Sequence, residues 1–285
     1  MTDAMKKLLF IAAAALALCL AACDKDNGGG SSSSAGFKAV KYSNLMFDIV
    51  HFAQELTPTF EDGKLVKIVE KGWNSTTWTE DGKPANIIQS RESVYTLKWD
   101  DKTKKISGTI SDKYYDEESG KLVPAEKTET ISGTFDADGK LTSYSDGFFN
   151  KSYTYSGKQL TKVDEYNYSW EGGNIVRHDV WNTTYANVTY GDEEYKVPAH
   201  ADILKGFMVS GDIMVVLGLC GEACKKIPVS HTEITPGEYG GSMHYVFSYK
   251  KDASGRLVSI TRQLTDATTG EPIGDSHVER WEIIY

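Results

Sequence analysis

The chain has 285 residues, with 40 acidic and 31 basic side chains and a formal net charge of −9 at pH 7. This surplus of negative charge excludes the basic surface that binding to nucleic acid phosphates requires. Residues 37–285 are numerous enough for one large domain or two ordinary ones, and the lack of a second linker in the sequence favours one.

The N-terminus predicts an exported protein. Lys6 and Lys7 precede an uncharged apolar run over residues 8–20, which is the pattern of a secretory signal peptide. The run is too short for a membrane-spanning helix, which needs about 20 apolar residues. It ends in LAAC at residues 20–23, which resembles the bacterial lipobox.

The lipobox resemblance implies that residues 1–22 are removed and that Cys23 carries a lipid anchor, with acyl chains such as palmitate. Several acyl chains on one residue give stable membrane attachment. In the alternative, Cys23 is a small apolar residue at the end of an ordinary signal peptide. Residues 23–36 are charged and then rich in glycine and serine, so we expect a flexible tether.

The charges directly after Cys23 also resemble an export signal of surface lipoproteins from Bacteroidetes. We therefore expect a lipid-anchored protein of the outer membrane. Either its periplasmic face or the cell surface fits the sequence, and the export signal favours the surface.

The first folded segment allows two structures. Leu45, Ile49, Phe52 and Leu56 lie at helical spacing before Pro58, which predicts a helix over residues 43–58. The apolar stretch at the start of this segment would also fit a buried strand.

A recurring theme follows along the chain: an aromatic residue, a polar turn with glycine, a basic residue or glutamine, and then leucine. It reads FEDGKLVKI, FDADGKLTSY, YSGKQLTKV and YKKDASGRLVSI at residues 60–68, 135–144, 155–163 and 249–260, with WEGGNIVRH at 170–178 as a looser copy. Each copy predicts a β-hairpin, because glycine and aspartate accept the positive φ angles of tight turns. Between residues 135 and 190 the hairpins are close enough for an uninterrupted meander.

Alternation within the strands predicts one aromatic face and one largely polar face. In ESVYTLKW, for example, Tyr95, Leu97 and Trp99 share one face of a strand. Residues 197–219 interrupt this pattern: a short helix is expected after Pro198, followed by the most apolar segment of the mature chain, which we expect inside the sheet structure. The sequence therefore predicts an all-β fold, an antiparallel meander of hairpins forming a curled sheet or barrel-like domain, with one or two short helices.

Cys220 and Cys224 are the two cysteines that remain after the lipobox. In an oxidising compartment, thiols four residues apart in a turn or helix can come within bridging distance, so we expect a disulfide. A redox pair would need one residue fewer between them, and zinc would need two further ligands.

No catalytic motif stands out in the sequence. It contains no G-x-S-x-G, no H-E-x-x-H, no Walker loop and no Rossmann glycine pattern, and its six histidines are scattered. We expect no enzymatic activity, no metal and no cofactor. A hydrolase with a carboxylate pair assembled from distant strands remains an alternative.

The sequence therefore favours a noncatalytic binding or scaffold domain with a saccharide or protein partner. Aromatic residues on strands can stack on sugar rings or anchor a protein partner. The tryptophans selected as candidates are Trp73, Trp78, Trp170 and Trp181. Each of them could instead belong to the core.

Several of these stretches together resemble a known family. They are YSWEGGNIVRHD at 168–179, YGDEEYKV at 190–197, LGLCGEACKKIP at 217–228 and the C-terminal GRLVSI and EIIY segments. They resemble Bacteroidetes lipoproteins classed as a domain of unknown function with a porin-like fold. The resemblance implies an antiparallel, barrel-like architecture and carries no catalytic residues.

A porin-like fold raises the alternative of an outer-membrane pore. Trp281, Ile283 and Tyr285 alternate and end on an aromatic residue, which resembles the terminal signature of outer-membrane barrels. A lipid anchor would be redundant on such a barrel, and the predicted strands have only one apolar face. We therefore expect a water-soluble domain that buries this face as its core.

Overall fold

A computed structural model describes residues 37–46, 49–80, 84–180, 183–194, 213–236, 241–273 and 276–285. The expected signal peptide, Cys23 and the tether lie outside the described residues. Within the described part, no helix is long and apolar enough to cross a bilayer.

The described chain is built almost entirely from strands. They are β1 (Ala39–Met46), β2 (Ile49–Glu61), β3 (Lys64–Trp78), β4 (Pro84–Asp100), β5 (Lys105–Asp116), β6 (Lys121–Pro124), β7 (Glu129–Phe135), β8 (Leu141–Ser145), β9 (Asn150–Ser156), β10 (Gln159–Val163), β11 (Tyr166–Glu171), β12 (Asn174–Val180), β13 (Thr183–Glu194), β14 (Lys226–Thr235), β15 (Gly241–Lys251), β16 (Leu257–Thr265) and β17 (Ser276–Ile284). One short helix, α3 (Ile213–Val216), lies between β13 and β14.

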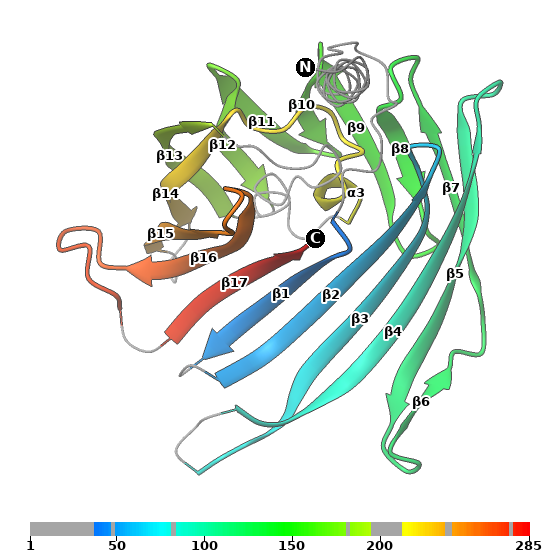
Figure 1. Cartoon of the computed structure of the whole chain (residues 1–285), viewed down its shortest axis with the longest axis horizontal. Helices are drawn as coiled ribbons and strands as arrows, with labels where there is room; N and C mark the ends of the chain where they lie inside the picture. Colours follow the sequence, from blue (N-terminus) through cyan, green and yellow to red (C-terminus); the bar gives the residue numbers. More distant parts are fainter. Residues whose placement is uncertain are drawn as a thin grey trace, which may run out of the picture. The chain divides into compact units, whose positions relative to one another are not determined.

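The strands form one antiparallel barrel (Figure 1). Sixteen of them pair with their neighbours in chain order, and β1 pairs with both β2 and β17, which closes the ring. The additional strand, β6, pairs with β5. The all-β prediction is confirmed, and so are all five predicted hairpins, which are β2–β3, β7–β8, β9–β10, β11–β12 and β15–β16.

The helix predicted over residues 43–58 is wrong, because β1 and β2 cover most of this segment. Both strands have partners on each side: β1 lies between β17 and β2, and β2 lies between β1 and β3. Backbone pairing along both edges outweighs a helical spacing of apolar side chains.

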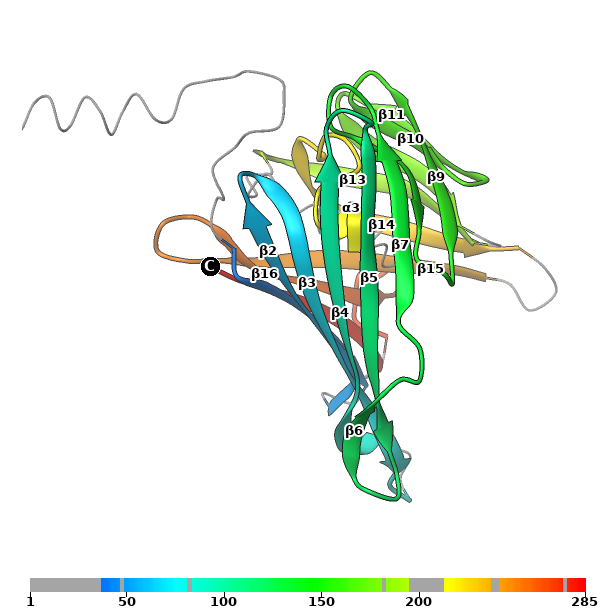
Figure 2. The same ribbon diagram turned by 90° about the vertical axis from the view of Figure 1, so that its right-hand side faces the viewer.

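The two ends of the barrel differ. The connections after β2, β4, β7, β9, β11 and β15 are tight turns, and both Phe37 and Tyr285 lie at this same end, which we call the turn end. The connections after β1, β3, β5, β8, β10, β12, β14 and β16 lie at the opposite end, which we call the loop end. There the long strands β3, β4 and β5 and the added strand β6 extend farthest (Figure 2).

The wall of the barrel buries both apolar and polar side chains, and its outward positions on β5 and β9 are polar. On β5, Ile106 and Ile110 are buried. The outward positions of this strand are Lys105, Ser107, Thr109, Ser111 and Lys113. Those of β9 are Asn150, Ser152, Thr154 and Ser156. Isolated apolar residues such as Ile284 interrupt this polar surface.

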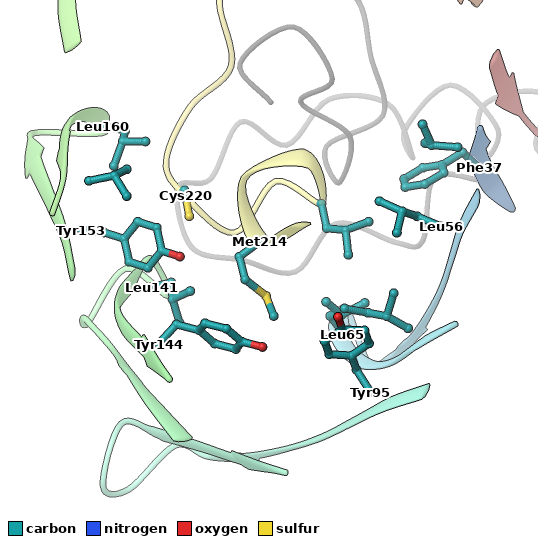
Figure 3. Close-up of a cluster of buried hydrophobic side chains, with 14 of the residues drawn as sticks. Phe37, Leu56, Leu65, Tyr95, Leu141, Tyr144, Tyr153, Leu160, Met214 and Cys220 are labelled. Carbon is teal, nitrogen blue, oxygen red and sulfur yellow. The ribbon is translucent and has the colours of Figure 1, made fainter. Parts of the chain in front are cut away.

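A segment between β13 and β14 fills the interior. Residues 213–225, which we call the plug, include α3 and lie inside the ring of strands (Figure 1). Met214 and Leu217 are almost completely buried, and Figure 3 shows Met214 between Tyr144 on one side and Leu65 on the other. For its described part, the apolar segment thus lies inside the sheet structure, as the sequence predicts. The predicted helix after Pro198 falls outside the described residues.

The plug is hydrogen-bonded to three successive hairpins at the turn end. The Leu219 carbonyl accepts from the Leu141 amide at 3.1 Å, and the amides of Glu222 and Lys225 donate to the carbonyls of Lys158 and Gly173. Gly221 has φ +79°, and a Cβ there would lie 2.4 Å from the Lys158 carbonyl oxygen. Only glycine fits this contact.

Six aromatic side chains, which we call the aromatic belt, connect neighbouring hairpins at the turn end. Each donates a hydrogen bond from its ring N–H or hydroxyl to a backbone carbonyl near the start of the preceding strand. The pairs are Trp99 with Leu65, Tyr155 with Leu141, Trp170 with Leu160, Tyr190 with Ile175, Tyr249 with Pro228 and Tyr285 with Leu257. The two strands of each pair are connected by the chain only at the loop end. The belt therefore holds them together at the turn end, where no turn connects them.

We predict that Trp170→Phe destabilises the barrel by about 1–2 kcal/mol, because it removes the 2.7 Å hydrogen bond to Leu160 and leaves that carbonyl without its donor. The measurement is urea unfolding followed by circular dichroism. Trp73→Phe is the control, because strand alternation places Trp73 on the face opposite the buried Glu70. Equal losses in the two variants would contradict a stabilising role of the belt.

Candidate functional site

Polar and aromatic side chains form a row around the inner wall. Across β11 to β15, stacked or tilted rings follow one another from Tyr168 through His178, Tyr185 and His231 to Tyr245, with neighbouring centroids 4.2–5.7 Å apart. The register explains the row, because Tyr168 pairs with His178, His178 with Tyr185, and His231 with Tyr245. Side chains of paired residues lie on the same face of the sheet.

His178 is completely buried in this row. Neither of its ring nitrogens has a hydrogen-bond partner among the described residues. Burial lowers the pKa of His178 well below its usual range, and the neighbouring His231 and Arg262 act in the same direction. His178 is therefore neutral at physiological pH.

Next to the ring row lies a buried ionic cluster formed by His231, Glu233, Arg262 and Glu279. The Arg262 guanidinium donates to Glu233 at 2.8 Å and lies 2.6 Å from a carboxylate oxygen of Glu279. Burial alone would lower the pKa of Arg262, but the two carboxylates outweigh it and raise this pKa. Burial lowers the pKa of His231 despite its contact with Glu233. Arg262 bridges the two carboxylates, so the cluster links β14, β16 and β17.

A second polar cluster lies across β2 to β5 and borders a cavity. Glu70 is only 8% exposed, and its carboxylate accepts from the Gln54 amide at 2.6 Å and from the Tyr95 hydroxyl at 2.8 Å. Arg91 donates to Asp112 at 3.2 Å. Burial by itself would lower the pKa of Arg91, but Glu70, Tyr95 and Asp112 together raise it.

The cavity has a volume of about 320 Å³ and lies towards the loop end. This size is at the lower end of the range of small-molecule sites. Its floor is apolar and includes Ile110 of the wall and Ile213 and Met214 of the plug. The remaining lining residues are polar or aromatic: Gln54, Glu70, Arg91, Tyr95, Tyr114, Tyr144, Asp146, Phe148, Phe149 and Lys151. An apolar floor with a few convergent polar groups makes this cavity the candidate functional site.

The tryptophans selected from the sequence do not come together in this cavity. Trp170 belongs to the aromatic belt and packs against the core. Trp73 is half-buried on β3, and neither of these two lines the cavity. Trp78 pairs with Pro84 in the β3–β4 register, and Trp181 lies outside the described residues. Their role in ligand binding stays a prediction.

Cys220 and Cys224 are buried thiols of the plug. The sulfur of Cys224 lies 3.8 Å from the hydroxyl of Tyr190 in the aromatic belt. The disulfide between the two cysteines stays a prediction. Within the described part of the chain, no three His, Cys, Asp or Glu side chains are grouped so that they could hold a metal ion.

Sequence reasoning missed most of the cavity residues because they come from six separate segments of the chain. Tyr95 stood out as a member of an aromatic strand face, and Ile213 and Met214 as part of the apolar segment expected inside the sheet structure. Phe148 and Phe149 carry a local signal: two adjacent aromatic residues follow the turn residues Asp146 and Gly147. Such a pair at a turn is expensive to expose and can indicate a contact surface.

We predict that acid destabilises the barrel through His178. The folded-state pKa of His178 is depressed, so its stabilising contribution is complete above the unfolded pKa of about 6.5 and is lost as the pH falls. For one histidine that stays neutral in the folded state, the free energy of unfolding falls by about 1.4 kcal/mol between pH 7.5 and pH 5.5. His178→Phe, which keeps the ring stack, should unfold in urea with a correspondingly weaker pH dependence. The stability of this variant at pH 8, compared with that of the wild type, measures the effect of the substitution on packing. A variant whose stability depends on pH as strongly as that of the wild type would contradict the assignment of this pH dependence to His178.

Comparison with known proteins supports the fold. No model of a known protein family and no curated protein sequence matches the chain. Among solved structures, the chain is similar to the crystal structure of a porin-like protein from Bacteroides uniformis. The TM-score is 0.54 at 13% sequence identity, and the match covers 87% of this chain and 96% of that chain. The chain therefore has a porin-like β-barrel fold, and its membership of the lipoprotein family suggested by the sequence stays a prediction.

Proposed function

We propose that this protein is a noncatalytic binding protein of the cell envelope, held at the outer membrane by lipid on Cys23, which takes a small ligand into the cavity of its barrel. The observation that carries this proposal is the cavity itself, with an apolar floor and an opposing set of carboxylate, amide and guanidinium groups. A porin-like fold is consistent with an outer-membrane location.

The polar outer wall supports tethering rather than insertion. A membrane-spanning barrel presents an apolar band about 25 Å tall to lipid and keeps its interior polar. On β5 and β9 the outward positions are instead lysine, serine, threonine and asparagine. Placing these side chains in hydrocarbon would cost more than leaving them in water.

The position of the cavity suits a tethered protein. Phe37, where the described chain begins, lies at the turn end, and the Lys38 amide next to it donates to the Ile284 carbonyl. The flexible tether that the sequence predicts over residues 23–36 would have a root-mean-square length of roughly 20 Å. The tether would therefore hold the turn end near the membrane, and the cavity at the loop end would face away from it.

The contacts of the carboxylates favour binding over hydrolysis. Glu70 and Asp112 come from different strands, as the hydrolase alternative requires, and both lie near Arg91. Each already accepts hydrogen bonds from protein donors, Glu70 from Gln54 and Tyr95, and Asp112 from Ser93 and Arg91. Carboxylates held in this way position a ligand and are poorly arranged to exchange protons with it.

An outer-membrane pore is the second candidate. It is favoured by the even number of antiparallel strands in the closed ring, as in membrane barrels. The plug opposes it, because Met214 and Leu217 fill the interior with buried apolar side chains and a pore needs a water-filled lumen.

We predict that small molecules bind in the cavity and that blocking its mouth abolishes this binding. Full-length Phe148→Cys protein, reconstituted in phosphatidylcholine vesicles, is labelled after folding with a bulky maleimide. Binding of a fragment library that contains charged, apolar and sugar compounds is then followed by saturation-transfer NMR. The wild-type thiols Cys220 and Cys224 are shielded because both are buried.

Ile273→Cys labelled in the same way is the control, because Ile273 is 46% exposed and does not line the cavity. Loss of fragment binding in the Phe148→Cys protein alone would support the proposal. If no fragment binds, or if both labelled proteins bind equally, the cavity is not a ligand site.

We also predict that Cys23→Ala releases the protein from the membrane. The variant should lose incorporation of a fatty-acid probe and move to the soluble fraction without detergent, because its outer wall is polar. The measurement is probe labelling with fractionation of cells that express the wild type or the variant. A variant that stays in the membrane and conducts ions in planar bilayers would establish the pore instead.

A further inference from the structure

The mouth of the cavity carries two exposed phenylalanines on a locked turn. Phe148 is 59% exposed and Phe149 is 63% exposed. The Asp146 carboxylate accepts from the amides of both residues, at 3.0 Å and 2.8 Å. Gly147 has φ +86°, and a Cβ at this position would lie 2.7 Å from Glu129. These bonds fix the backbone that carries both rings at the cavity, which lowers the entropy cost of using them for binding.

The charges around the cavity select against a charged ligand. Arg91 and Lys151 contribute two positive charges, and Glu70, Asp146 and the Arg91 partner Asp112 contribute three negative charges, which leaves a net charge of −1. An anion gains little from such a surface. A cation would compete with protein cations for the aromatic rings, because Arg91 lies 5.9 Å from the Tyr114 ring centroid and Lys151 lies 5.9 Å from that of Phe149.

The polar groups inside the cavity fit hydroxyl groups. A hydroxyl both donates and accepts a hydrogen bond, so it pairs best with a site that presents donors and acceptors side by side. Glu70 offers carboxylate oxygens, Gln54 offers an amide and Arg91 offers guanidinium N–H groups within one lining. The buried Nε of Arg91 has no hydrogen-bond partner among the described residues, and a purely apolar ligand would leave it unsatisfied, which is costly.

We propose that the cavity binds an uncharged sugar ring, with its apolar face stacked on Phe148 and Phe149 and its hydroxyl groups bound by Gln54, Glu70 and Arg91. A pyranose combines these features, since one face is lined by C–H groups and its edge carries hydroxyls. This inference rests on the proposed function and names the ligand class of the same cavity.

The experiment compares neutral, acidic and amino oligosaccharides on an array, using the full-length protein in phosphatidylcholine vesicles. Neutral sugars should bind, and acidic and amino sugars of the same size should bind more weakly. Phe148→Ala combined with Phe149→Ala should weaken neutral sugar binding by roughly tenfold or more, the loss expected from two aromatic contacts. Because both rings are exposed, this variant should keep the circular dichroism spectrum of the wild type.

Two further variants separate the outcomes. Glu70→Gln should also weaken neutral sugar binding, because it removes a carboxylate acceptor, and Ile273→Ala should leave binding unchanged. Neutral sugar binding that persists in the double phenylalanine variant would overturn the inference. So would fragment binding in the cavity without neutral sugar binding, although the proposed function would then stand. If neither fragments nor sugars bind, both proposals fail.

Discussion

The width of the barrel is the constraint on which the rest of the structure depends. Eight strands close around an interior that their own side chains can fill, whereas sixteen strands enclose far more space. Membrane porins leave this space to water, but here much of the inner wall belongs to an apolar core, and an empty lumen would lose both packing and burial. The plug resolves this problem by placing Met214 and Leu217 at the centre. Wall and plug therefore form one core, and neither is expected to be stable without the other.

The two ends of the barrel divide the tasks of stability and binding. At the turn end, the aromatic belt and the hydrogen bonds to the plug join hairpins that the chain itself does not connect there. The loop end lacks this belt and carries the cavity, the extended strands β3 to β5 and the exposed Phe148 and Phe149. Rigid anchoring at one end allows polar and aromatic groups to be presented at the other, as in many proteins that bind through loops on a stable scaffold.

Likeness to a porin-like protein describes the path of the backbone and leaves the chemistry of the two faces open. The same strand topology can turn its apolar side chains to lipid or to its own interior. In this chain Ile106 and Ile110 point inward and lysine, serine and threonine point outward along β5. Both inward arginines form ion pairs: Arg262 with Glu233 and Glu279, and Arg91 with Asp112. Such pairing suits a packed interior with a small polar site.

The sequence by itself determined the hairpins, because an aromatic residue, a glycine turn and a following leucine act within ten residues, and it determined which strand face is apolar. It also indicated that the segment containing Met214 and Leu217 belongs inside. It misassigned residues 43–58, where pairing with β17 and β3 outweighs helical spacing. Closure of the ring, the belt and the cavity were decided by tertiary structure alone, because they join residues far apart in the chain, such as Tyr42 with Trp281 and Glu70 with Phe148. Local patterns contain no information on which distant strands meet.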